Sequence, residues 1–267
     1  MKIIFQNKAL RSIAIVNFLF VASYAAFGVH SLFFFVHSAQ SETLRGAVIT
    51  GMALFAATQV GGVSLLSLFG SKISNSLVLL VLFRISAPIL LATPNRFTII
   101  AGMLFFGLSH AIYSVRSRVL VSQLLQNNDH LQVTAYSALS ITTNLAFLLA
   151  PPIGGYLLKT NLGLIPGVLL SIVCTAASLI VFFALNAQNK VNTPQKIETN
   201  KTPESISKFN KKNYLLDLIR FSAFILPYAI FMALIPIRGS NERLSAFQNG
   251  LLFGLNGLLI IVFQSAF

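Results

Sequence analysis

A few polar side chains interrupt long apolar stretches of this sequence, and their types could support chemistry. Arg84 stands in the middle of the run LVLLVLFRISAPILLA, and His110 lies inside another apolar run. A charge inside an apolar helix costs at least about 2.5 kcal/mol on membrane-insertion scales, so Arg84 needs a partner or a cavity. It could bind an anionic group of a substrate, or it could extend to the membrane surface or pair with a backbone carbonyl near Pro88. His110 could relay protons, or it could be a neutral packing residue.

Further polar residues fall on single faces of the expected helices. Asn17 and Tyr24 are seven residues apart, and residues spaced by three, four or seven share one helix face. These side chains could line a path for a substrate, or they could form ordinary hydrogen bonds between helices. Because the faces carry no dominant charge, they predict an uncharged or amphipathic substrate. The candidate residues for the substrate path are Asn17, Tyr24, Thr58, Gln59, Arg84, His110, Ser114, Ser137 and Asn144.

The residue content argues against several other kinds of site. Cys174 is the one cysteine, so no internal disulfide and no cysteine-based metal site can form. The six acidic residues fall in expected loops or, for Asp217, near an expected helix end. An enzyme active site inside a membrane would need converging His, Asp or Glu groups, so we expect no catalytic residue, metal or cofactor. We expect no nucleic-acid partner either, because the net charge of +13 is spread over loops.

Long apolar runs alternate with short polar breaks along the whole chain. Of the 267 residues 55% are hydrophobic and 9% are charged, whereas a soluble globular protein carries about 25% charged residues. A helix needs about 20 apolar residues to cross a bilayer. The sequence therefore predicts an all-α integral membrane protein that has the lipid bilayer as a partner. The expected helices cover approximately residues 12–36, 47–69, 75–92, 97–121, 133–158, 163–186, 214–237 and 246–266.

The basic residues predict how the chain is oriented. Most lysines and arginines outside the apolar runs, such as Lys2, Lys8 and those of residues 187–213, fall on one side of the expected membrane. Since cytoplasmic loops carry an excess of Lys and Arg, the N-terminus and residues 187–213 are predicted to be cytoplasmic. We expect a multi-pass protein of the cell membrane, either inner or plasma membrane. Residues 187–213 are polar and lysine-rich, which is typical of a flexible linker.

Helix positions and linker together divide the chain into three parts. Residues 1–186 are expected to form a six-helix transmembrane bundle, and residues 187–213 a basic cytoplasmic linker. Residues 214–267 are expected to form a partial second bundle of two helices. The composition shift at residue 187 is the observation on which this division depends.

The fifth expected helix carries the most specific motif. It reads NLAFLLAPPIGG over residues 144–155 and resembles the helix-5 signature of the major facilitator superfamily, a Gly-Pro pair followed two residues later by Gly-Gly. Ala150 stands at the first glycine, and the rest of the motif is Pro151, Pro152, Gly154 and Gly155. Small residues let two helix backbones approach closely, and prolines permit a bend. The motif therefore suits a hinge-like contact between two moving bundles.

Two further stretches are similar to motifs of this superfamily. Residues 67–76 correspond to its basic loop between helices 2 and 3, with Ser71 at the acidic position and Lys72 at the following basic one. Residues 107–111 read GLSHA and are similar to its helix-4 stretch, with Met103 at a position where an arginine is often found. The resemblance covers essentially the whole chain.

The resemblance implies a secondary active transporter that moves a small-molecule substrate by alternating access, and the helix-5 signature is associated with exporters. Coupling to protons stays open, because no carboxylate lies deep in the first six helices. Superfamily members have two bundles, so we expect a fold truncated after its eighth helix, with the second half missing or supplied by another chain. The alternative is a truncated, non-transporting remnant or a membrane interaction protein.

Overall fold

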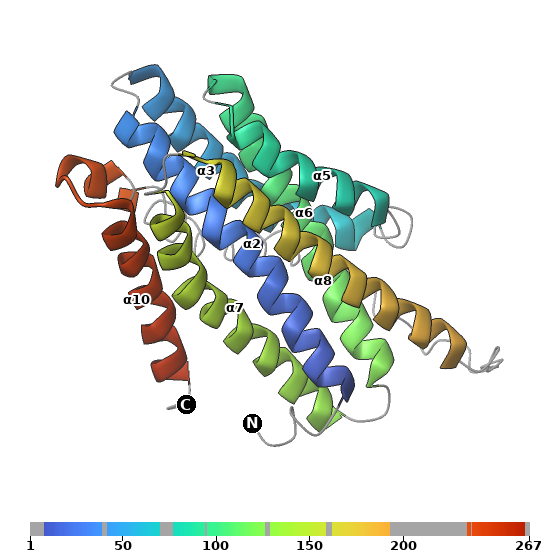
Figure 1. Cartoon of the computed structure of the whole chain (residues 1–267). Coiled ribbons are helices and arrows are strands. Elements are labelled where there is room, and N and C mark those ends of the chain that lie inside the picture. The colour runs from blue at the N-terminus through green and yellow to red at the C-terminus, as the bar shows by residue number, and fades with distance from the viewer. Residues whose placement is uncertain are drawn as a thin grey trace, which may run out of the picture.

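The computed structural model describes residues 8–38, 42–69, 77–93, 95–125, 129–158, 162–192, 234–235 and 237–264. Within these residues the chain forms long α-helices and no strand, so the predicted all-α fold is confirmed (Figure 1). The helices are α2 (Lys8–Ser38), α3 (Glu42–Phe69), α5 (Leu77–Leu91), α6 (Arg96–Leu124), α7 (Asp129–Leu157), α8 (Ile165–Asn192) and α10 (Ala246–Gln264).

The helices lie where the apolar runs predicted them, and several extend further into polar sequence. α8 continues to Asn192, so the first residues of the expected linker are helical. The next strong stop is Pro194, because a proline disfavours helical backbone in the residue before it. The remainder of the expected linker, most of the expected helix 214–237 with Asp217, and the motif residues 70–76 lie outside the described residues.

Among the first six helices, the first helix of each group of three packs mainly against helices of the other group. α2, the first helix of the first three, packs mainly against α7 and α8. α6, the first helix of the second three, packs mainly against α3 and α5. Each group of three therefore contributes one helix to the other group, which ties the bundle together and is typical of folds built from internal repeats. Figure 1 shows α2 in the middle of the bundle with α7 and α8 on either side of it.

The outside of the bundle is apolar and part of its inside is polar. Val78, Leu82 and Ile89 are exposed along one side of α5, whereas Arg84 of the same helix is fully buried. On α8, Val173 is exposed and other positions turn small hydroxyl side chains inward. This distribution is expected for helices in lipid, where apolar side chains face the hydrocarbon. Four described spans are long and apolar enough to cross a membrane, namely Leu10–Gly28, Arg96–Leu124, Leu131–Leu157 and Ile165–Leu185.

An aromatic cluster formed by Tyr24, Phe55, Phe106 and Phe147 fills the middle of the bundle. The ring of Tyr24 stacks on Phe55 with centroids 4.7 Å apart and meets the edges of Phe106 and Phe147 at 5.4 and 6.1 Å. Apolar side chains of α2, α3 and α6 extend this cluster toward the end of the bundle where α2 stops and α3 starts. That end is therefore closed by packed side chains.

Candidate functional site

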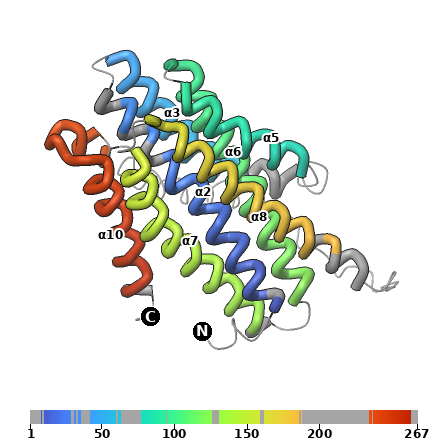
Figure 2. The backbone as a smooth tube through the Cα atoms, in the orientation of Figure 1, coloured from blue at the N-terminus to red at the C-terminus, as the bar shows by residue number. Residues whose placement is uncertain are grey.

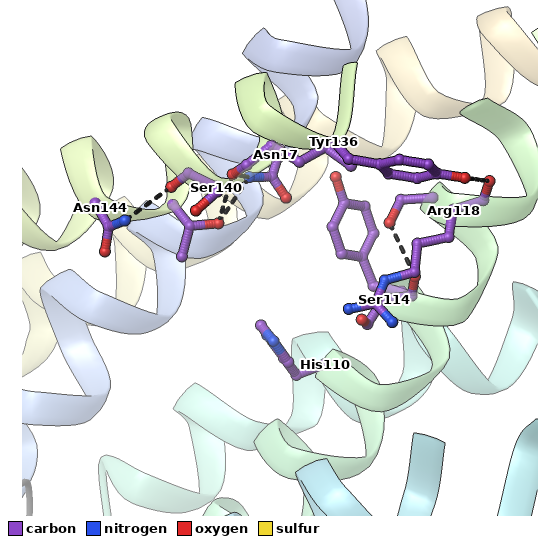
Figure 3. A pocket seen from close by; sticks show the side chains of 11 residues that line it. Asn17, His110, Ser114, Arg118, Tyr136, Ser140 and Asn144 are labelled. Carbon is purple, nitrogen blue, oxygen red and sulfur yellow. Dashed lines mark hydrogen bonds between the residues drawn. The ribbon is translucent and has the colours of Figure 1, made fainter. Parts of the chain in front are cut away.

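A cavity of about 650 Å³ opens between α2, α6 and α7 (Figure 3). It lies in the half of the bundle where α2 and α7 begin and α6 ends, which is the side opposite the closed end. Figure 2 shows that α2 begins at this same side of the bundle. The walls are made by Asn17 of α2, by His110, Tyr113, Ser114, Ser117 and Arg118 of α6, and by Tyr136, Leu139, Ser140, Thr143 and Asn144 of α7.

Asn17 joins α2 to α7 at one side of the cavity. Its amide nitrogen lies 2.8 Å from the carbonyl oxygen of Leu139 and 2.9 Å from the hydroxyl oxygens of Thr142 and Thr143. These are donor–acceptor distances of good hydrogen bonds. Because Asn17 is buried and reaches three acceptors on one helix, it fixes the position of α2 against α7 as well as lining the cavity.

His110 and Tyr113 form the opposite wall on α6. The imidazole Nδ1 of His110 and the hydroxyl group of Tyr113 are both buried and have no hydrogen-bond partner. In Figure 3 the imidazole of His110 stands across the cavity from Asn17 and Asn144. The Tyr113 ring stacks on Phe20 with centroids 3.9 Å apart, and His110 lies 6.5 Å from the same ring. Buried polar atoms without partners are rare, and here they border the cavity.

Arg84 lies behind this wall and does not line the cavity. Its side chain is fully buried, and its guanidinium carbon lies 4.0 Å from the centroid of Phe20 and 5.0 Å from that of Phe106. One terminal nitrogen donates to the carbonyl oxygen of Phe20 and, at 2.6 Å, to the hydroxyl of Ser23. The partner carbonyl therefore belongs to α2 and not to the region of Pro88. Nε and the other terminal nitrogen have no partner.

The mouth of the cavity carries an exposed charge and local hydrogen bonds. Arg118 is exposed at the rim, and the Tyr136 hydroxyl lies 3.5 Å from its carbonyl oxygen. Asn144 donates from its amide nitrogen to the carbonyl oxygen of Ser140 at 3.1 Å, within its own helix. Figure 3 shows these groups facing one open space. The wall therefore offers hydroxyls, amides and one cation, and none of the lining residues is acidic.

The structure gathers only some of the expected substrate-path residues. Asn17, His110, Ser114 and Asn144 line the cavity, and Arg84 lies behind it. The other four expected residues do not line it. Tyr24 belongs to the aromatic cluster, and Thr58 donates to the carbonyl oxygens of Leu54 and Phe55 at 2.8 and 2.9 Å within α3. Gln59 is half-buried elsewhere on α3, and Ser137 is exposed on α7.

On α7 the expected residue Ser137 lies one position away from a residue that lines the cavity. Ser137 is exposed and does not line the cavity, whereas Tyr136 lines it with Ser140 and Thr143. Tyr136, Ser140 and Thr143 are spaced by four and three, so the sequence contained the signal for this face as well. The same holds for Tyr113 and Arg118, which line the cavity beside the expected residues of α6.

The sequence profile described as Major Facilitator Superfamily matches residues 13–267. This chain belongs to the major facilitator superfamily. The predicted family and the multi-pass membrane character are thereby confirmed, and the family is one of transporters rather than enzymes. No curated protein matches the sequence.

A solved structure has the same fold as this superfamily member. It is a crystal structure of the peptide transporter POT, in a mutant form with bound sulfate. The two chains superpose with a TM-score of 0.57 at 17% sequence identity. The match covers 85% of this chain and 46% of the other, so the chain spans less than half the length of the transporter it matches. At this identity the likeness shows the fold alone.

The helix-5 motif of this superfamily member lies at the contact between α7 and α10. A methyl group on Gly254 would lie 2.8 Å from the carbonyl oxygen of Leu148, and one on Gly257 would lie 2.6 Å from that of Asn144. Only glycine permits backbones to approach this closely, as is common where membrane helices pack on small residues. On α7, Ala150, Pro151, Gly154 and Gly155 are buried, whereas Pro152 is half-buried.

Proposed function

We propose that this protein moves a small organic molecule across the cell membrane as a secondary active transporter, in the direction of export. The observation that supports this best is the cavity of about 650 Å³ with polar walls inside a bundle whose outer surface is apolar. A cavity of this size can hold a small molecule, and ligand sites typically combine apolar surface with a few placed polar groups. The direction follows from the resemblance of residues 150–155 to the signature of exporters.

The arrangement suits alternating access. The cavity opens at the side where α2 begins, which the basic residues predict to be cytoplasmic. Apolar side chains beyond the Tyr24 cluster pack together at the other side. In the proposed cycle, the helices around the cavity rock against the neighbouring bundle, so that the closed side opens as the cavity mouth closes. The close contact between α7 and α10 is where such a movement would take place.

The decisive experiment is an efflux assay on cells expressing the chain, with a compound library and with one variant that fills the cavity. Ser140→Phe places a ring in the cavity wall and should abolish efflux of any transported compound, because the bulky side chain occupies the binding volume. Ser137→Phe is the matched control, since Ser137 is exposed on the same helix and does not line the cavity. Equal loss in both variants, or efflux that survives Ser140→Phe, would contradict a role for this cavity.

A further inference from the structure

Arg84 is a charge without a counter-charge among the residues that the structure describes. Its guanidinium is fully buried, and of its three nitrogens only one has hydrogen-bond partners, both of them uncharged. The acidic residues in the described part of the chain, Glu42, Asp129 and Glu242, stand at the first turns of α3 and α7 or in the turn before α10. A buried cation that lacks an anionic partner is unusual, because buried charges are almost always paired.

The ring of Phe20 lies between this cation and residues of the cavity wall. Phe20 packs against Arg84, 4.0 Å from the guanidinium carbon, and it also stacks on Tyr113 with centroids 3.9 Å apart. Tyr113 lines the cavity, as does His110, which lies 6.5 Å from the same ring. An anion in the cavity could therefore reach the guanidinium only if the fully buried Phe20 ring turned aside.

The cavity itself is suited to an anion. The hydroxyl of Tyr113 is buried without a partner and can donate a hydrogen bond, and Arg118 places a second positive charge at the rim. No lining residue carries a negative charge. The rest of the wall consists of hydroxyl, amide and aromatic groups, which can contact a partly apolar organic body.

We propose that the cavity binds an amphipathic organic monoanion, a carboxylate or a sulfonate, whose charged group pairs with Arg84 when the Phe20 ring turns aside. A carboxylate or sulfonate can accept a charge-assisted hydrogen bond from Nε or from the unpartnered terminal nitrogen of Arg84. The ring of Phe20 stabilises the empty state by covering the cation, because an aromatic face attracts a guanidinium. The inference rests on the proposed function only in treating this cavity as the substrate site.

The test measures binding directly on the purified full chain in lipid nanodiscs. The probes are naphthoate, naphthalenesulfonate and the uncharged naphthamide, and the readout is the rise in unfolding temperature with probe concentration. Both anions should raise the unfolding temperature of the wild type and naphthamide should not. Arg84→Gln should weaken anion binding about tenfold or more, as expected for a lost charged hydrogen bond. Arg96→Gln is the matched control, because Arg96 is exposed at the start of α6, far along the helix from the cavity.

A second variant keeps the proposal testable if Arg84→Gln does not fold. Phe20→Leu retains the carbonyl that Arg84 contacts but removes the covering ring, so it should bind both anions more tightly. The proposal is wrong if naphthamide binds as tightly as the anions, if no probe binds at millimolar concentration, or if Arg84→Gln folds and binds the anions unchanged. Anion binding without efflux would overturn the transport function alone, and efflux with binding of only the neutral probe would overturn this inference alone.

Discussion

A methyl group added to Gly250 of α10 would lie 2.6 Å from the carbonyl oxygen of Pro151 in α7. Gly250→Ala should therefore destabilise the protein by about 1–3 kcal/mol, since a backbone carbonyl cannot move aside without shifting its helix. Gly46→Ala is the matched control in α3, where a methyl group would meet nothing within 4 Å. It should stabilise by roughly 0.5–1 kcal/mol through helix propensity alone. Thermal unfolding in detergent measures the change in stability of each variant. Changes in unfolding temperature of the same sign in both variants would contradict the close α7–α10 contact.

The helix-5 motif should be needed for movement more than for insertion. Replacing Pro151 and Gly154 together by leucine adds bulk where α7 is buried, and it removes the proline that permits a bend. We expect the double variant to reach the membrane in normal amounts and to lose efflux. Membrane fractionation and the efflux assay measure the two effects separately. Normal efflux by this variant would remove α7 from the mechanism.

Arg84→Leu should separate insertion from activity. Leucine at this position should favour membrane insertion by about 2.5–3.5 kcal/mol, because an arginine at the centre of a helix opposes insertion by that amount. Transport should nevertheless be lost, since the buried cation is gone. An insertion assay on residues 77–92 and efflux by the full chain test both parts. Ile85→Leu, at an exposed position of the same helix, is the control and should change neither. Unchanged transport by Arg84→Leu would make the arginine a structural residue only.

Asn17→Leu should cost less stability than its three short contacts suggest. Thr142 and Thr143 also donate to carbonyl oxygens of their own helix, so neither hydroxyl loses its last partner when Asn17 is replaced. Hydrogen bonds between membrane helices are worth about 0.6 kcal/mol on average and at most about 1.7. We expect a loss within that range by thermal or denaturant unfolding. Asn144→Leu, whose bond stays within α7, should cost less, and the reverse order would contradict the bridging role of Asn17.

Cysteine labelling can test the side on which the cavity opens. In a Cys174→Ser background, Ser114→Cys should react with a membrane-impermeant maleimide applied from the cytoplasmic side, because Ser114 lines the cavity. Ser109→Cys should not react from either side, since Ser109 on the same helix is fully buried. The expected result is labelling of inside-out vesicles and weak labelling of intact cells. Labelling of intact cells alone would reverse the predicted orientation.

The sequence by itself determined the positions of the helices and the kind of solvent around them. Apolar runs of membrane-spanning length dictate helices, because lipid offers the backbone no hydrogen-bond partner, and this property is local to each run. The Ala-Pro and Gly-Gly positions of residues 150–155 could likewise be recognised from the sequence alone. They constrain how closely a neighbouring helix can approach, and the structure places α10 there.

Only the tertiary structure decided which polar residues meet. Arg84 donates to the carbonyl of Phe20, 64 positions earlier in the chain, and no local pattern specifies that pair. On α7, Ser137 and Tyr136 differ by a rotation of about 100° about the helix axis, which decides whether a side chain lines the cavity. Helix rotation is set by packing against neighbours, here α2 and α10. The cavity is therefore a property of the assembled bundle, although the sequence indicated four of the residues that line it, Asn17, His110, Ser114 and Asn144.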